Sequence, residues 1–148
     1  MSLLLGLRNF ASQTINTFGF VGLGNVYRRY CKKNNCGVPT FSNTDTSVSL
    51  NQQGIYHVTI TAVATGTTAG IVTIELLENG VAVPSAFSSQ TITTPNTELR
   101  TLVIDTYILV DSDCVLGSPT TLAKTLSVQN TGVDATFTSV VFNIEKVV

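Results

Sequence analysis

The sequence is poor in charged side chains. Asp, Glu, Lys and Arg make up 11% of its 148 residues, against roughly 25% in an average soluble domain. Hydrophobic residues make up 43%. A monomer with so few charges has little protection against association through its β surfaces. We therefore expect much of the surface to be buried in an oligomer or a larger assembly, although a threonine-rich β surface could also remain soluble alone.

Groups that carry out chemistry are scarce as well. The only histidine, His57, alternates with threonines, which favours a solvent- or interface-facing side chain over a general base. Three cysteines, Cys31, Cys36 and Cys114, do not make a disulfide framework, although the first two could form a local bridge or remain thiols. The sequence contains no P-loop, dinucleotide fingerprint, nucleophile elbow or pair of metal ligands. It therefore predicts a protein that is not an enzyme, with no catalytic residues, metal site or cofactor.

The N-terminal residues lack the features of a secretory or membrane-spanning segment. Polar residues interrupt their apolar run, which makes it too polar for a spanning helix of about 20 mainly apolar residues, and most cations follow it. An amphipathic helix over residues 3–17 is instead expected from apolar side chains at helical spacing, which are Leu3, Leu4, Leu7, Phe10, Ala11, Ile15 and Phe18. Attraction to lipid would be weak because the polar face carries one arginine, so we expect packing on protein.

Acidic residues are missing from the start of the chain. Residues 1–44 contain five cations and no acid, whereas the remainder contains three cations and nine acids. Such an asymmetry indicates that the two parts face different surroundings. We predict that residues 1–44 form an anchoring arm and linker, and that the side chains that anchor it are Arg8, Phe10, Phe18, Tyr27, Arg28, Arg29, Tyr30, Lys32 and Lys33.

The partner of this arm is predicted from its charge. An acidic protein surface is favoured, and a solvated basic linker is the alternative. Nucleic acid is disfavoured because the four cations within residues 28–33 make a small electrostatic footprint and the rest of the chain is acidic.

From residue 45 onward the pattern changes to a period of two. In residues 54–66, Tyr56, Val58 and Ile60 share one face, and His57 and Thr59 share the other. The dipeptide Asn79-Gly80 is a strong signal for a two-residue hairpin. Strands of this kind recur with turns every 8–12 residues, and no helical pattern separates them. The sequence therefore predicts an antiparallel sandwich or jelly roll of about eight strands over residues 45–148.

Several of these segments occur in the order found in a known superfamily. They are the G-x-Y strand at Gly54 to Ala62, the strand–Asn-Gly–strand hairpin within Glu75 to Val83, the turn at Asp111 to Ser118, and the closing strands LSVQNTG and VVFNIEKV. The chain resembles the trimeric jelly roll of the tumour necrosis factor and complement globular-head superfamily. Its version is most similar to the tips of exosporium collagen-like proteins and to phage head-fibre and capsid-decoration proteins.

The resemblance implies a homotrimer and no catalysis, and two departures from it bear on function. Ser112 replaces the usual glycine of the Gly-Asp turn, and no Gly-X-Y stalk precedes the head, which favours a shell anchor over an exosporium protein. Aromatic residues gather at buried interface centres, so the predicted trimer-interface residues are Tyr56, Tyr107, Phe137 and Phe142. Filling the core of each subunit is the alternative for them, above all for Phe142.

These observations lead to one functional hypothesis and one alternative. The hypothesis is a structural protein whose head trimerises and whose arm binds the major capsid protein, or another shell protein, of a phage. The virion surface is then its location. The alternative is a receptor- or carbohydrate-binding module on a virion, spore or cell surface.

Overall fold

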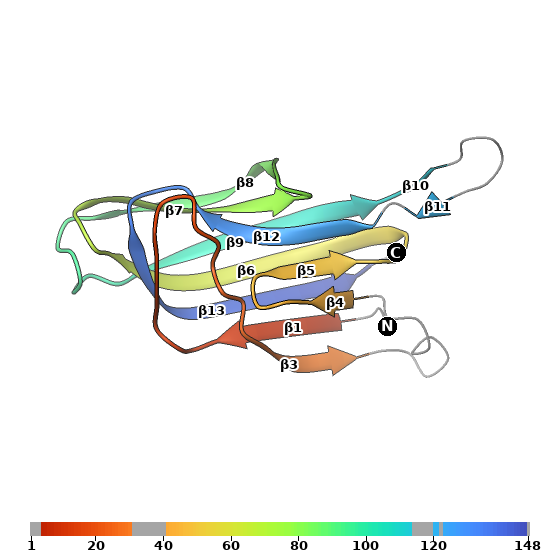
Figure 1. Cartoon of the computed structure of the whole chain (residues 1–148), viewed down its shortest axis with the longest axis horizontal. Helices are drawn as coiled ribbons and strands as arrows, with labels where there is room; N and C mark the ends of the chain where they lie inside the picture. The colour runs from red at the N-terminus through yellow and green to blue at the C-terminus, as the bar shows by residue number, and fades with distance from the viewer. Residues whose placement is uncertain (1–3, 31–40, 114–119, 122, 148) are drawn as a thin grey trace.

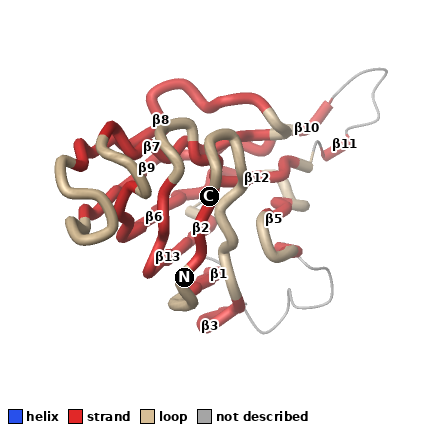
Figure 2. The backbone as a smooth tube through the Cα atoms, turned by 60° about the vertical axis from the view of Figure 1, so that its left-hand side comes forward, coloured by secondary structure: helices blue, strands red, loops and turns tan. Residues whose placement is uncertain are grey.

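The computed structural model describes residues 4–30, 41–113, 120–121 and 123–147, and every helix or strand element in these ranges is a β-strand. The strands form two antiparallel sheets that lie face to face, with the hydrophobic core between them (Figures 1 and 2). The predicted all-β jelly-roll sandwich is confirmed.

The first sheet, called sheet A, consists of β1 (Leu4–Asn9), β2 (Gln13–Ile15), β3 (Asn25–Tyr30), β6 (Gly54–Gly66), β9 (Arg100–Val110) and β13 (Ala135–Lys146). Its strand order is β3-β1-β13-β6-β9, and β2 also pairs with β13. The second sheet, called sheet B, consists of β4 (Phe41–Asn43), β5 (Ser47–Leu50), β7 (Gly70–Glu78), β8 (Val81–Ile92) and β12 (Lys124–Asn130), in the order β4-β5-β12-β7-β8. A small separate ribbon pairs β10 (Ser112–Asp113) with β11 (Thr120–Thr121).

The central strands follow the period of two that the sequence predicts. In β6, Tyr56, Val58 and Ile60 are fully buried, whereas His57 and Thr59 between them are partly exposed. Antiparallel neighbours extend this division across sheet A, because residues in register place their side chains on the same face. Sheet A therefore has an apolar inner face that packs against the core and an outer face most of whose side chains are partly or fully exposed.

The predicted hairpin at Asn79-Gly80 is also confirmed. Glu78 pairs with Val81, so the two residues between them form the whole connection of β7 to β8. Asn79 has a φ of 51° and Gly80 a φ of 80°, which are the positive values that a type I′ turn requires.

The helix predicted over residues 3–17 is wrong, because this segment forms strands β1 and β2. Leu5 and Leu7 of β1 are fully buried in the core, and β1 pairs with β13 along its whole length. The last strand of the sequence thus supplies the backbone partners that a helix would have supplied locally. Isolated apolar runs are compatible with either structure until such a partner is known.

Residues between β2 and β3 cross from sheet A to sheet B and return. Val21 donates a backbone hydrogen bond to the carbonyl of Val128 at 2.8 Å, and Leu23 donates one to Asp45 at 2.7 Å. Figure 1 shows this segment passing β12, the strand to which Val21 is hydrogen-bonded, before it descends into β3. Val21 and Leu23 are fully buried. Residues 4–30 are therefore part of the sandwich, whereas the charge pattern predicted an anchoring arm and linker over residues 1–44.

Three of the aromatic residues predicted at the trimer interface belong to the core instead. Tyr56, Phe137 and Phe142 each have 0% exposed surface in the single chain. A side chain that is already inaccessible cannot contribute buried area to a second subunit, so the interface prediction is wrong for these three. Tyr107, the fourth, is 63% exposed, and its interface role stays a prediction.

Candidate interaction site

The outer face of sheet A gathers side chains from five strands. One row runs in register from Tyr30 of β3 through Leu4, Glu145 and His57 to Tyr107 of β9. This row crosses the full width of the sheet. One side of the face is apolar and the other is cationic.

The apolar side lies over β9 and the adjoining ends of β6 and β13. Leu109 is in register with Ile55, and the backbone N–H of Val147 donates to the Ile55 carbonyl at 2.8 Å, so these three residues are neighbours. The apolar patch is defined as Ile55, Val103, Tyr107, Leu109 and Val147, each of which is 37% to 63% exposed. Asp105 separates Val103 from the other four along the same face of β9. Contiguous exposed apolar side chains such as these four mark sites of interaction with other molecules.

His57 lies at the border of the apolar patch. Its Nε2 is 2.5 Å from Oδ1 of Asp105, and its ring stacks on Tyr107 with the centroids 5.0 Å apart. These contacts come from the neighbouring strand and fix the imidazole on the outer face. In the part of the chain that the structure describes, no serine, threonine or cysteine nucleophile is hydrogen-bonded to this pair, as a hydrolytic triad would require. His57 therefore lies on the outer face of the sheet, in keeping with the solvent- or interface-facing side chain that the sequence predicts.

A depression of about 250 Å³ separates the two sides of the face. Its lining comes from β1, β6 and β13 and consists of Leu4, His57, Thr59, Asn143, Ile144 and Glu145. Among the described residues no group of three or more histidine, cysteine, aspartate or glutamate residues could hold a metal ion. Within the same ranges no helix is long and apolar enough to cross a bilayer.

The cationic side is built on β1 and β3. The guanidinium of Arg8 lies 5.0 Å from the ring centroid of Tyr27 and 5.3 Å from that of Phe10. The guanidinium of Arg28 lies 5.5 Å from the Tyr27 ring. These are cation–π distances. We refer to Arg8, Phe10, Tyr27 and Arg28 as the arginine–aromatic cluster.

Tyr27 is held in place by a local irregularity of the sheet. The pairing of β1 with β3 shifts register between Gly6 and Leu7, so Tyr27 is the additional residue of a β-bulge. Its hydroxyl donates to Oδ1 of Asn143 at 2.8 Å. A Cβ at Gly6 would lie 2.9 Å from the Tyr27 ring. Glycine at this position therefore leaves the space that the ring occupies above β1.

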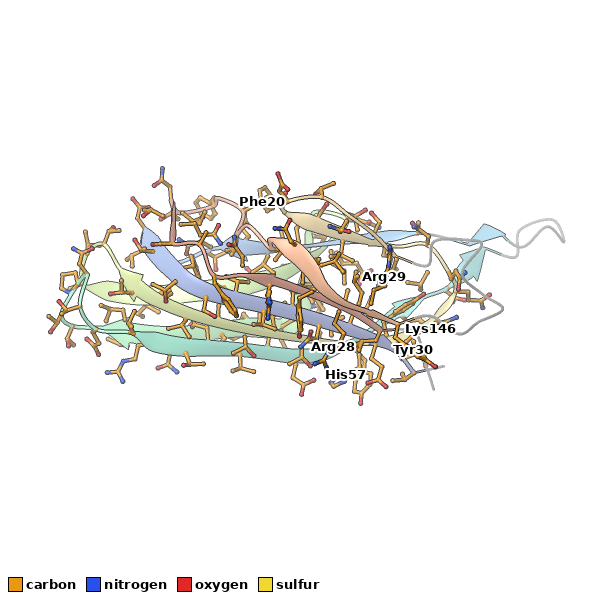
Figure 3. The ribbon with its side chains drawn as sticks, turned by 90° about the horizontal axis from the view of Figure 1, so that it is seen from below. Phe20, Arg28, Arg29, Tyr30, His57 and Lys146 are labelled. Atoms are coloured by element: carbon orange, nitrogen blue, oxygen red, sulfur yellow. The ribbon has the colours of Figure 1, made fainter. Side chains whose placement is uncertain are left out.

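The structure brings together some of the predicted anchoring residues and separates others. Figure 3 shows Arg28, Tyr30 and His57 on the same side of the sandwich, with Arg29 apart from them. Arg29 pairs with Leu5 of the core face, so it leaves β3 on the side opposite Arg28. Phe18 lies near sheet B, where its backbone N–H donates to Asn130. The two predicted lysines, Lys32 and Lys33, lie outside the described residues.

Most of the apolar patch was not predicted from the sequence. In β9 the inward positions Leu102, Ile104, Ile108 and Val110 are buried in the core. Its outward positions include Val103 and Leu109, which are apolar where a solvated strand would carry polar residues. Apolar residues at both sets of alternate positions were the signal that could have identified this patch.

Comparisons with solved structures place this architecture among known folds. The chain is similar to the globular domain of a zebrafish complement 1qA protein (TM-score 0.62, 9% identity, covering 99% of this chain and 98% of that chain). It is also similar to murine APRIL (TM-score 0.64, 10% identity, 99% and 100% coverage) and to an Eiger TNF from S. frugiperda (TM-score 0.67, 12% identity, 100% and 92% coverage).

This chain has the tumour necrosis factor and complement globular-head jelly-roll fold. The resemblance that the sequence motifs predicted is confirmed at the level of the fold. No protein-family model matches the sequence, and no curated protein matches it. The low identities mean that function has to be argued from the residues on the outer face of sheet A.

Proposed function

We propose that this protein is a non-enzymatic homotrimer that attaches to a protein shell, as a decoration or head-fibre protein of a phage capsid. The observation that carries the trimer is the apolar patch on the outer face of sheet A. Burial of apolar surface stabilises association by about 25 cal/mol per Å², and Asp105, which lies among these side chains on β9, is paired with His57. Three subunits are proposed because the fold resembles a superfamily of trimeric jelly rolls.

Attachment to a shell is supported by the other side of the same face. In the described residues, neither Arg8 nor Arg28 has an acidic partner. The ion pairs that the described residues do form lie elsewhere in the sandwich. Two cations held on aromatic rings without a carboxylate are suited to an acidic surface outside the chain. The proposed location is therefore the surface of a virion.

The trimer is tested by native mass spectrometry and light scattering on two matched variants. Leu109→Glu places a charge in the apolar patch, and Val81→Glu places one on the hairpin of sheet B, where Val81 is 70% exposed. The wild type and Val81→Glu are expected to be trimers, and Leu109→Glu a folded monomer. A monomeric wild type, or a trimeric Leu109→Glu, would contradict the proposed assembly.

Attachment is tested on particles. Virions purified on a density gradient should contain this chain by mass spectrometry, and a variant with Arg8→Gln and Arg28→Gln should be depleted from them. Trimers that form normally but never co-purify with a shell would leave the fold intact and exclude the decoration role.

A carbohydrate-binding role is the second candidate, and a feature of sheet B favours it. Phe20, Gln129, Glu75 and Phe87 lie in one row across the outer face of sheet B. The two phenylalanines are 46% and 59% exposed, and a polar amide and a carboxylate lie between them. Aromatic faces can receive the C–H groups of a sugar, while the polar pair receives its hydroxyls.

A glycan array with the full chain tests this candidate. Binding that disappears in Phe87→Ala and persists in Ile71→Ala, whose side chain is 54% exposed on the same strand pair, would support a sugar site. No binding to any glycan would exclude it.

A further inference from the structure

Strand β3 forms one end of sheet A, and its outer edge is open in the described part of the chain. β1 pairs with one side of β3, and no described strand pairs with the other side. Five of its six residues are exposed. A strand with a free edge presents unpaired N–H and C=O groups that can pair with another extended chain.

The opposite end of sheet A is different. The backbone N–H of Val103 in β9 donates to Oγ of Ser88 at 3.2 Å, and β8 lies alongside β9. Part of the β9 edge is therefore satisfied within the subunit. The two terminal strands of the sheet do not offer equivalent sites to a partner.

The side chains at the open edge carry a specific charge. Arg28 of β3 and Arg8 of β1 both stack on Tyr27, and neither forms an ion pair with a described residue. Stacking restricts each guanidinium while leaving the N–H groups at its rim available, so less entropy is lost when a carboxylate binds. Arginine binds carboxylates with paired hydrogen bonds in this way.

We propose that β3 binds an extended acidic segment of a partner protein, which adds to sheet A as a new edge strand. Its carboxylates, at every second residue on the outer face, pair with Arg28 and Arg8. This inference rests on the proposed attachment function and names the chemistry of its partner. Nucleic acid fits less well, because two arginines neutralise few phosphates and the open backbone edge would remain unused.

The probe is a synthetic peptide of about ten residues, a common strand length, in which glutamate alternates with threonine. Fluorescence anisotropy measures its binding to the full-length protein, and amide hydrogen exchange reports on the β3 backbone. Binding is expected to weaken as salt is raised, and the amides of Asn25–Tyr30 are expected to gain protection.

Two control peptides distinguish the contribution of backbone hydrogen bonds to binding from that of the carboxylates. One has glutamine in place of glutamate, and the other has N-methyl groups on alternate residues, which removes the hydrogen bonds of one edge while retaining every carboxylate. Both should bind more weakly than the probe by about tenfold or more. Equal binding of the N-methylated peptide would overturn strand addition, because charge alone would then suffice.

Matched variants of the protein test the cluster. Arg28→Lys retains the charge but loses the planar, stacked donor, and should weaken binding about three- to tenfold. Gly6→Ala should weaken it by displacing the Tyr27 ring without removing any charge. Arg100→Gln is the control, because Arg100 already pairs with Glu98 and lies away from β3. An effect of Arg100→Gln equal to that of Arg28→Lys would contradict a site at β3.

Native mass spectrometry on the same samples distinguishes this inference from the proposed function. A trimer that co-purifies with virions but does not bind the peptide would overturn strand addition alone. Conversely, peptide binding by a monomeric chain would support the open edge and contradict the trimer. Displacement of the probe by a single-stranded oligonucleotide at equal concentration would show that the arginine–aromatic cluster binds phosphate groups. That result would also overturn the proposal.

Discussion

Strands β1 and β6 lie on either side of β13 and use their two faces differently. β1 buries Leu5 and Leu7 on the inner face and presents Arg8 on the outer face. β6 buries a longer apolar series and presents uncharged side chains, Ile55, Thr59 and Thr61, beside His57. The inner faces are equivalent in character, whereas the outer faces differ in charge. A strand with cations on its outer face, such as β1, can therefore still bury apolar side chains in the core. The net charge of a segment does not show whether that segment belongs to the sandwich or lies outside it.

The largest effect is expected when β1 is removed. Deletion of residues 1–24 should abolish cooperative folding, because it removes Leu5, Leu7, Val21 and Leu23 from the core. Burial of each such side chain contributes about 1.5 to 3 kcal/mol, and the total approaches the whole stability of a typical domain. Circular dichroism and thermal melting measure the outcome. A truncated chain that melts like the full chain would show that β1 is dispensable.

Part of this architecture follows from the sequence by local rules. The alternation in residues 54–66 and the Asn79-Gly80 turn act over a few residues, so their physical basis is visible in the sequence. The placement of β1 is different because its partner, β13, begins at residue 135. Leucines near the start of the chain fit a helix as well as a strand. Only the distant partner decides between them.

The candidate site also contains residues that local patterns predict and residues that they do not. Tyr56 shares a face with Val58 and Ile60, so the alternation that predicts the core also excludes Tyr56 from an interface. Tyr107 lies on the outward positions of its strand and is exposed. The arginine–aromatic cluster, in contrast, depends on a β-bulge that brings Tyr27 above Gly6. A bulge depends on how two strands pair with each other, so no pattern within β1 or β3 alone predicts it.

A second test compares two adjacent residues of β1. Leu7→Ala should lower the free energy of unfolding by about 2 to 5 kcal/mol, because it leaves a cavity in the core. Arg8→Ala should change it by about 0.5 kcal/mol or less, since Arg8 is an exposed side chain. Urea unfolding of both variants measures the difference. Similar losses in the two variants would mean that β1 does not separate its faces as described.

A third test compares the buried Tyr56 of β6 with the exposed Tyr107 of β9. Burial raises the pKa of Tyr56 to about 12 from 10.0, against the opposing effect of its hydrogen bond to the Gln52 carbonyl. The neutral phenol is thus favoured in the folded state, and this stabilisation is complete below pH 10 and is lost as the pH rises through 12.

Tyr56→Phe should therefore reduce the loss of stability between pH 10 and 12. At neutral pH it should cost about 1 kcal/mol, for the hydrogen bond of 2.6 Å that its hydroxyl donates to Gln52. Tyr107→Phe, on the exposed side of the neighbouring strand, is the control and should retain the wild-type alkaline profile. Denaturant unfolding at several pH values measures both variants.

The smallest expected effect concerns an arginine that, unlike Arg8, has a carboxylate partner. Glu98 pairs with Arg100, and it also accepts hydrogen bonds from the backbone N–H groups of Thr94 and Thr93 and from the Thr93 hydroxyl. These contacts, the Thr94 N–H first, lower the pKa of Glu98 to about 2 from 4.5. The ionised form is favoured on folding, so its contribution is complete above pH 4.5 and is lost as the pH falls through 2.

Glu98→Gln should accordingly flatten the dependence of the melting temperature on pH between 4.5 and 2, while changing little else. Thr93→Val removes one donor and retains the backbone contacts, so its profile should lie between those of the wild type and Glu98→Gln. An unchanged acid profile in Glu98→Gln would show that this network does not stabilise the loop before β9.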